Sequence, residues 1–293
     1  MSLACDLRAL LARVRVLPRR LSLSTPGVQA TVPTLRGVWG AALHDLAPEA
    51  YADVFEGRGR PHERTPAYVL RPAPPDPSDA PAVEFILIGD AVRHDAAAMR
   101  AWDIASGMGL GRWRRRFVVR RARALSPSGE AASPDVPATP WPVSGAAWPL
   151  EGDPASTPCR LRFEAPLRIV RDGELVERPA LADVAVAALR RVTAFAPAGT
   201  RAEARRLART VAEIARDIPC EPWSGERLDL VRYSARQRVD IELRGVAGVM
   251  GLPAGPGELW PLLAAARWLH VGKGTTVGMG QPLMEPGGQE RRA

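Results

Sequence analysis

The chain has 293 residues, which is long enough for two domains that each bury a core. The formal net charge is +8, and this basic balance favours a polyanionic partner. The cysteines Cys5, Cys159 and Cys220 lie far apart and form no Cys-x-x-Cys pair, so we expect neither disulfides nor structural zinc. Residues 1–16 are interrupted by charges, so we expect no signal peptide, no membrane span and a cytoplasmic protein.

The first half of the chain has the element order β-α-β-β-α-β, which is typical of a ferredoxin-like domain. Apolar residues at helical spacing predict helices over residues 34–47, with Thr34 as the N-cap, and over residues 91–106. Strands are expected at residues 14–23, 68–71, 83–89 and 116–125. We therefore place an N-terminal domain at residues 1–125.

Residues 126–158 differ in composition from the segments on either side. They are rich in Pro, Ser, Ala and Gly and show no period, so we expect a linker or surface loop. The tryptophans Trp141 and Trp148 within this segment are expected to pack onto a domain.

Residues 159–293 predict a second ferredoxin-like domain with one added helix and a C-terminal glycine-rich loop. The expected helices are residues 180–195, 201–218 and 259–270. The expected strands are residues 160–171, 228–234, 239–249 and a short strand-like run at 275–283. The predicted fold class is therefore α+β, with two tandem ferredoxin-like, RRM-like (βαββαβ) domains.

The segment from His270 to Gly280 is the most unusual part of the chain. It contains Lys273, the only lysine, among four glycines and two threonines. Glycine permits a positive φ and has no Cβ, so such a loop can turn its N–H groups towards an anion. We therefore expect a phosphate to contact the loop, through Gly272, Lys273, Gly274, Thr275 and Thr276.

This loop matches neither of two familiar phosphate-binding motifs. Arg267 stands where a Walker loop needs its first glycine, and Gly274 follows the lysine. A Rossmann fingerprint runs from strand to helix, whereas here a helix precedes the glycines. A nucleotide-binding enzyme is thus a weaker alternative.

Arginines form several candidate groups for contacts with a polyanion. On the added helix they lie nearly opposite an apolar stripe, at about 100° per residue. The overall excess of arginine either serves phosphate recognition or reflects genomic base bias. Each group of arginines is either a contact with the polyanion or a solvated surface. The candidates are Arg112, Arg114, Arg121, Arg123, Arg205, Arg209 and Arg216. Tyr233, Arg236 and Gln237 are candidates for contacts with unpaired bases.

Four segments resemble, in sequence order, the CRISPR repeat-processing endoribonucleases of the RAMP superfamily. They are residues 35–44 (LRGVWGAALH), 107–117, 233–237 and 269–280, of which the last is the most specific. The resemblance implies metal-independent cleavage of precursor guide RNA by 2′-hydroxyl attack, with no cofactor. It also implies binding of a repeat hairpin with a 3′ single strand, and retention with guide RNA in a CRISPR effector complex. The alternative is a RAMP subunit that holds guide RNA without cutting it.

The resemblance places catalytic candidates on and after the first long helix. His44 can act as general base or acid, because an imidazole gives or takes a proton near neutral pH; otherwise it is a solvated residue beside Asp45. Arg36 lies at the helix start and is expected to contact phosphate, unless it is a surface charge. Tyr51 either positions the nucleophile or packs in the core, and Arg20 is a further RNA-binding candidate.

Overall fold

The computed structural model describes residues 2–25, 30–57, 65–73, 81–133, 135–234 and 239–287, with side chains outside residues 201 and 230–243. The chain forms two compact units. Unit 1 comprises Met1–Arg13, Val143–Thr275 and Met279–Ala293, and unit 2 comprises Val14–Pro142 and Thr276–Gly278. This division differs from the expected domains 1–125 and 159–293, because the first thirteen residues pack with unit 1 and three loop residues pack with unit 2.

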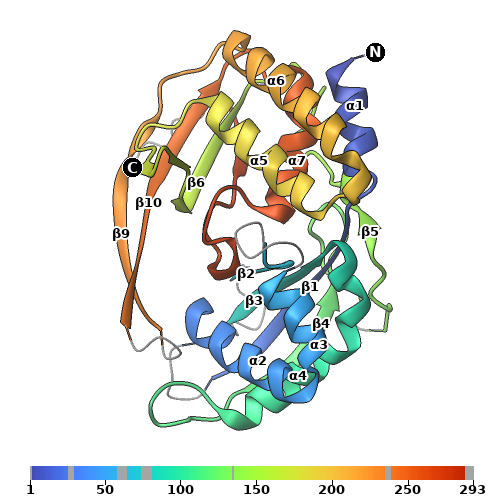
Figure 1. Cartoon of the computed structure of the whole chain (residues 1–293), viewed down its shortest axis with the longest axis vertical. Helices are drawn as coiled ribbons and strands as arrows, with labels where there is room; N and C mark the ends of the chain where they lie inside the picture. The colour runs from blue at the N-terminus through green and yellow to red at the C-terminus, as the bar shows by residue number, and fades with distance from the viewer. Residues whose placement is uncertain are drawn as a thin grey trace. The chain divides into compact units, whose positions relative to one another are not determined.

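Unit 2 has the ferredoxin-like order predicted from the sequence. Its main elements are β1 (Arg15–Ser24), α2 (Val32–Leu46), β2 (Tyr68–Pro72), β3 (Ala82–Ile88), α4 (Asp95–Met108) and β4 (Val118–Ala124). The strands pair antiparallel in the order β2-β3-β1-β4, and a short β5 (Trp141–Pro142) adds to β1. Helices α2 and α4 cover this sheet (Figure 1). A short helix, α3 (Pro48–Tyr51), and a π-helical turn (Ala52–Glu56) follow α2.

The core of unit 2 is aromatic and holds α2 in place. Trp39 stacks on Trp102 of α4 with ring centroids 5.5 Å apart, and its ring meets Phe85 of β3 at 4.8 Å. Helix α2 begins one turn earlier than predicted, because Thr31 is the N-cap and Thr34 is its partner in a capping box. The helix therefore presents a fixed face to the strands.

Unit 1 repeats the fold with additions. Its main elements are β6 (Cys159–Leu167), α5 (Leu181–Phe195), α6 (Arg201–Asp217), β9 (Ser224–Ser234), β10 (Val239–Leu252), α7 (Trp260–Leu269) and β11 (Leu283–Pro286). The sheet order is β11-β6-β10-β9, the same permutation as in unit 2. A small hairpin joins β7 (Val170–Arg171) to β8 (Glu174–Leu175). The α+β class with tandem ferredoxin-like domains is confirmed.

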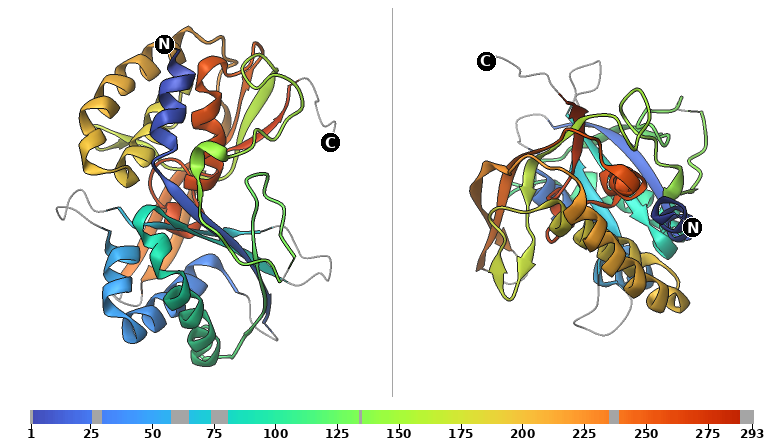
Figure 2. Two further views of the ribbon diagram at one scale, coloured as in Figure 1. Left: turned by 90° about the vertical axis from the view of Figure 1, so that its right-hand side faces the viewer. Right: turned by 90° about the horizontal axis from the view of Figure 1, so that it is seen from above.

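The first helix of the chain, α1 (Leu3–Leu11), was not predicted. Its leucines Leu3, Leu7, Leu10 and Leu11 are buried, and the helix packs beside α7 and α6 (Figure 2). Arg8 places its guanidinium 4.5 Å from the ring centroid of Trp260. Charges within the segment suggested an interruption, but they lie on the outward side of a short amphipathic helix.

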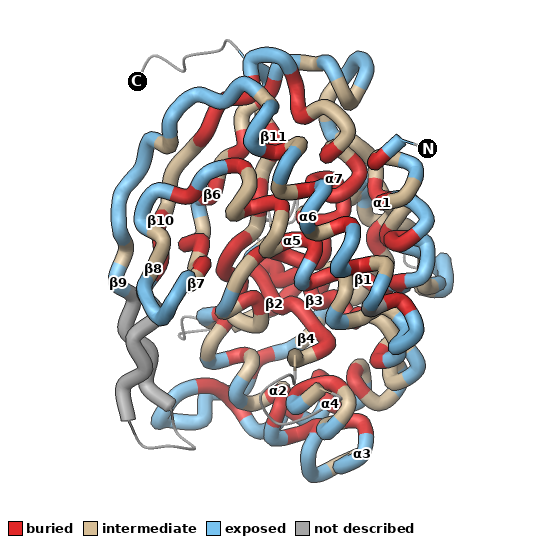
Figure 3. Tube along the Cα trace, turned by 45° about the horizontal axis from the view of Figure 1, so that its top comes forward, coloured by how far each residue is buried: buried red, intermediate tan, exposed pale blue. Residues whose placement is uncertain are grey.

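The added helix α6 has the two faces predicted for it. Leu207 and Val211 are buried, whereas the arginines of its other face are exposed, so buried and exposed residues alternate along α6 (Figure 3). Helix α7, by contrast, is almost entirely buried. The strand-like run expected at 275–283 is wrong: residues Thr275–Val277 form a 3-10 turn and β11 begins at Leu283. Gly278 and Gly280 have φ values of 86° and 72°, which a strand cannot contain.

Both tryptophans of the expected linker pack onto the folded units. Trp141 in unit 2 donates its indole N–H to the Leu125 carbonyl at 3.3 Å. Trp148 in unit 1 lies edge-on to Trp260, with ring centroids 6.5 Å apart. Across the described residues, no helix is long and apolar enough to span a bilayer.

Candidate functional site

Four side chains of unit 2 form a continuous row beside α2. The His44 ring lies edge-on to the Tyr51 ring, with centroids 5.0 Å apart. Tyr51 stacks on Phe55 at 4.8 Å, and the Arg36 guanidinium carbon lies 5.4 Å from the Phe55 ring centroid. The row therefore carries an imidazole at one end and a guanidinium at the other, joined by two aromatic rings.

A glycine on α2 makes the row possible. Arg36, Gly40 and His44 follow one another at intervals of four residues, so they lie near one face of the helix. A Cβ added at Gly40 would lie 2.7 Å from Cε1 of Phe55, which no carbon tolerates. The missing side chain lets the Phe55 ring rest directly on the helix backbone between the two polar residues.

Arg36 is oriented by a buried phenol on the neighbouring strand. Its Nε donates a hydrogen bond of 2.7 Å to the hydroxyl oxygen of Tyr68, at the start of β2. The same phenol shares a hydrogen bond with the hydroxyl of Thr276, and burial raises the pKa of Tyr68 to about 12. The phenol is therefore neutral at physiological pH and fixes Arg36 as a dipole, without neutralising its charge.

Tyr68 was not among the candidates from the sequence. It begins a short apolar strand, and a buried aromatic residue in such a strand is usually core. Its hydroxyl, which must find a partner when buried, was the only signal available.

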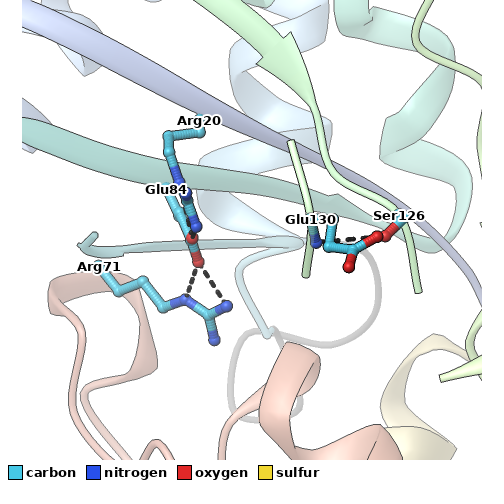
Figure 4. A network of polar contacts seen from close by, with 5 residues as sticks. All are labelled: Arg20, Arg71, Glu84, Ser126 and Glu130. Carbon is cyan, nitrogen blue, oxygen red and sulfur yellow. Dashed lines mark hydrogen bonds and ion pairs between the residues drawn. The ribbon is translucent and has the colours of Figure 1, made fainter. Parts of the chain in front are cut away.

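The charge of Arg36 is uncompensated, whereas Arg20 is paired. Among the described side chains, no carboxylate lies within ion-pair distance of Arg36. Arg20 donates from Nε and from Nη2 to Oε1 of Glu84, at 3.2 and 2.7 Å. The same carboxylate accepts from Arg71, whose Nε lies 2.6 Å from Oε2, so Glu84 sits between two guanidinium groups (Figure 4).

The ion pairs of Glu84 with Arg71 and Arg20 lower the pKa of its carboxyl group. Burial alone would raise the pKa of the Glu84 carboxyl, but the guanidinium groups of Arg71 and Arg20 outweigh burial and hold it below its usual range. Arg20 therefore serves the packing of the sheet first, and it is a weaker RNA-binding candidate than the sequence suggested.

His44 and Arg36 do not meet. The His44 side chain is 61% exposed, and its Nδ1 lies 3.3 Å from the exposed carboxylate of Asp45. The positions differ by eight residues, or about 12 Å along the helix axis. Tyr51 therefore contacts His44, where it could position the imidazole. Arg36 bonds Tyr68 and does not contact His44.

The glycine-rich loop is ordered mainly by bonds within unit 1. The N–H groups of Lys273 and Gly280 donate to the carbonyls of Arg168 and Pro166, at 2.8 and 3.0 Å. Buried His270 adds a 2.8 Å contact from Nδ1 to the carbonyl oxygen of Met279. The N–H groups of Lys273 and Gly280 are therefore occupied by these carbonyls, and phosphate contacts of the loop stay a prediction for its other groups.

The side chains of the loop differ in their exposure. Lys273 is exposed, whereas Thr275 is only 4% exposed, which makes Thr275 a weaker candidate for a phosphate contact. Gly272 and Gly274 have φ values of 78° and 79°, which makes glycine necessary for the turn itself.

The remaining RNA-binding candidates lie outside the row. Arg123 is half-buried, while the exposed arginines are Arg112, Arg114, Arg121, Arg205, Arg209 and Arg216. Tyr233 is described by its backbone alone, within β9, and Arg236 and Gln237 fall outside the described residues.

The comparisons with known proteins agree on one family. The family model of the CRISPR-associated endoribonuclease Cas6 matches residues 161–282. No curated protein matches the chain in sequence. The fold is similar to that of a Cas6 product complex, with a TM-score of 0.56 and 21% identity over 92% of this chain and 99% of that chain. A Thermus thermophilus Cas6 gives a TM-score of 0.57 and 16% identity over 93% and 99%.

These matches extend over the same elements that carry the resemblance in the sequence. The family model spans β6 to the glycine-rich loop, and the structural likeness extends over 92% of the chain. The chain is therefore similar to the CRISPR-associated endoribonuclease Cas6 family in sequence over residues 161–282, and to solved Cas6 proteins in fold.

Proposed function

We propose that the protein is a metal-independent endoribonuclease that binds the repeat of precursor CRISPR RNA and cleaves it to release guide RNA. The row from His44 to Arg36 carries this proposal, because it combines an exposed imidazole with an unpaired guanidinium on one helix face. A proton-transfer group and a fixed positive charge are what cleavage by an internal hydroxyl requires.

In the proposed reaction the 2′-oxygen upstream of the cut attacks the phosphorus, and the bond from phosphorus to the 5′-oxygen breaks. A general base takes the 2′-hydroxyl proton and a general acid protonates the leaving 5′-oxygen. The products are a 2′,3′-cyclic phosphate and a 5′-hydroxyl end. His44 takes one of the two proton-transfer roles, and Tyr51, edge-on to its ring, positions the imidazole.

Arg36 acts on phosphate in this proposal. Its Nε is held by Tyr68, so the terminal nitrogens of the guanidinium remain for two parallel hydrogen bonds to phosphate oxygens. The separation of about 12 Å from His44 along the helix favours a phosphate next to the scissile one.

The exposed arginines of α6 and the loop residue Lys273 supply further phosphate contacts in this proposal. These residues carry no described carboxylate partner, so binding is expected to weaken steeply with salt. The protein then stays on its product as a subunit of a CRISPR effector complex.

The alternative is a subunit that holds guide RNA without cutting it. The exposure of His44 and its distance from Arg36 favour this alternative, since the described residues offer no second proton-transfer group in contact with His44 besides Asp45 and Tyr51.

One experiment separates the two. Purified protein is incubated in EDTA with the repeat RNA of its own genome, beside a copy carrying one 2′-deoxy substitution before the expected cut. Cleavage of the first RNA alone, with a cyclic phosphate end detected by mass spectrometry, supports the endoribonuclease. Tight binding with no cleavage of either RNA supports the guide-holding subunit.

The same assay tests the site. His44→Ala is expected to lower the single-turnover rate by about 10²–10⁴-fold, the usual contribution of a general acid or base. Arg36→Ala is expected to weaken both binding and cleavage. Unchanged rates in both variants would refute the assignment of this row.

A further inference from the structure

We propose that Trp113, at the tip of the loop between α4 and β4, stacks on an unpaired base of the bound RNA. This inference rests on the proposed function as an RNA-binding protein and names a contact that the catalytic row does not include. Its basis is an exposed indole on a hydrogen-bonded turn whose sequence segment, residues 107–125, carries only positive charge.

Trp113 differs from every other tryptophan of the chain. Its relative exposure is 70%, whereas the other seven of the eight tryptophans are buried or half-buried. An indole left in water forfeits the burial that usually accounts for tryptophan in a folded protein. Met108 and Val118, on either side of the loop, are also exposed, at 38% and 56%. Such exposed apolar side chains mark an interaction surface.

The turn that carries Trp113 is closed and anchored. The backbone N–H of Leu110 donates to the Arg115 carbonyl at 2.8 Å, and the reverse bond is 3.1 Å. Leu110 and Phe117 are buried, with 1% and 2% exposure, so both ends of the loop are fixed in unit 2. The tip residues Arg112 and Trp113 are thereby held outwards on a short hairpin.

Two backbone conformations define this turn further. Gly109 has a φ of 76°, and a Cβ there would lie 2.3 Å from the Arg114 carbonyl oxygen. Arg114 itself has a φ of 46°, which few non-glycine residues adopt. A turn so constrained loses little entropy when it binds, which favours recognition by a preorganised surface.

The positive charge of residues 107–125 favours an anionic partner. Residues 107–125 contain no Asp or Glu, and their arginines are Arg112, Arg114, Arg115, Arg116, Arg120, Arg121 and Arg123. The Arg112 guanidinium carbon lies 4.2 Å from the Trp113 ring centroid and covers one face of the indole. The other face can receive a nucleobase while neighbouring arginines contact phosphates, the usual arrangement for single-stranded RNA.

The test compares Trp113→Ala and Trp113→Phe on the repeat RNA that carries the 2′-deoxy substitution, so that binding is measured without cleavage. Loss of one stacked base is expected to weaken binding about 5- to 150-fold in Trp113→Ala, and Phe should restore most of it. Both variants should melt at the wild-type temperature, since the side chain is exposed.

Salt dependence distinguishes stacking from charge. Trp113→Ala should leave the slope of log K against log salt unchanged. Arg114→Ala should lower that slope by about 0.7 to 0.9, as expected for one lost phosphate contact. A changed slope in Trp113→Ala would overturn stacking as the cause.

Abasic nucleotides then locate the base. Each unpaired position of the RNA is replaced in turn, and at one position Trp113→Ala should cause no further loss. Equal affinity of wild type and Trp113→Ala would overturn the inference while leaving the proposed function intact. Loss of self-association in Trp113→Ala by sedimentation, with unchanged RNA affinity, would overturn it in favour of a protein partner. If the wild type binds no repeat RNA, the inference and the proposed function both fall.

Discussion

Gly40 is expected to be the most sensitive glycine of α2, although it contacts no substrate. An alanine methyl at this position would lie 2.7 Å from Cε1 and 2.9 Å from Cζ of Phe55. The ring must retreat by roughly 1 Å to reach an ordinary contact, although it already packs against the rings of Tyr51, Trp39 and Tyr68. We therefore expect Gly40→Ala to disturb the support of His44.

Two opposing effects set the expected change in the free energy of unfolding of Gly40→Ala. Alanine in a helix interior is favoured over glycine by about 1 kcal/mol. Overpacking in a filled core costs about 1–3 kcal/mol. The net change for Gly40→Ala is therefore a loss of about 0–2 kcal/mol in the free energy of unfolding.

Gly37 provides a matched control on the same helix. A Cβ there meets no heavy atom within 4 Å, and the residue is exposed. Gly37→Ala is thus expected to stabilise the protein by about 0.4–1 kcal/mol, without displacing Phe55. The same substitution, one helical turn away, should change stability in the opposite direction.

Circular dichroism melting and single-turnover cleavage of repeat RNA measure the two effects. Gly40→Ala is expected to cleave about 10- to 100-fold more slowly, because displacement of a supporting group by about 1 Å can cost this much. Gly37→Ala should cleave at the wild-type rate. If Gly40→Ala is stabilised like Gly37→Ala and cleaves normally, then Phe55 does not position the catalytic row.

Three further variants have expected outcomes. Tyr68→Phe removes the acceptor of Arg36 Nε and should weaken RNA binding about tenfold in filter binding. Because the pKa of Tyr68 is raised to about 12, wild type should lose stability as pH rises from 10 towards 12, and melting curves of Tyr68→Phe should lack this loss. Glu84→Gln should cost about 3–5 kcal/mol at pH 7, since it removes the buried carboxylate that pairs with both Arg71 and Arg20. The Glu84 pKa is lowered, so this difference should shrink as pH falls below about 4.3. Arg209→Ala should reduce the salt slope of RNA binding by about 0.7–0.9.

The sequence predicted the fold because its signals are local. Apolar spacing defined α2 and α6, and the strand order of both sheets followed from the β-α-β-β-α-β connection. The secondary-structure prediction missed or misassigned segments whose local pattern fits two kinds of structure. The charges of α1 face outwards from an amphipathic helix, and the threonines before Gly278 form a turn rather than a strand.

The candidate site was predicted only in part. The resemblance selected His44, Arg36 and Tyr51, and the structure brings His44 to Tyr51 across two short helical segments. The sequence placed Arg36 and His44 on one helix, and it did not indicate that the buried phenol of Tyr68 accepts a hydrogen bond from Arg36. Such a pairing joins residues 32 positions apart, and no periodic pattern encodes it.

By itself the sequence determined the class of fold, the basic surface of α6, the arginine run after α4 and the resemblance to one family. These follow from composition, period and motif, which do not depend on neighbours in space. Only the tertiary structure decided which arginines pair with a carboxylate. Glu84 reaches Arg20 and Arg71 through strand pairing, while Arg36 meets a phenol that leaves its charge intact. A side chain's electrostatic state is set by the groups the fold brings within a few ångströms of it.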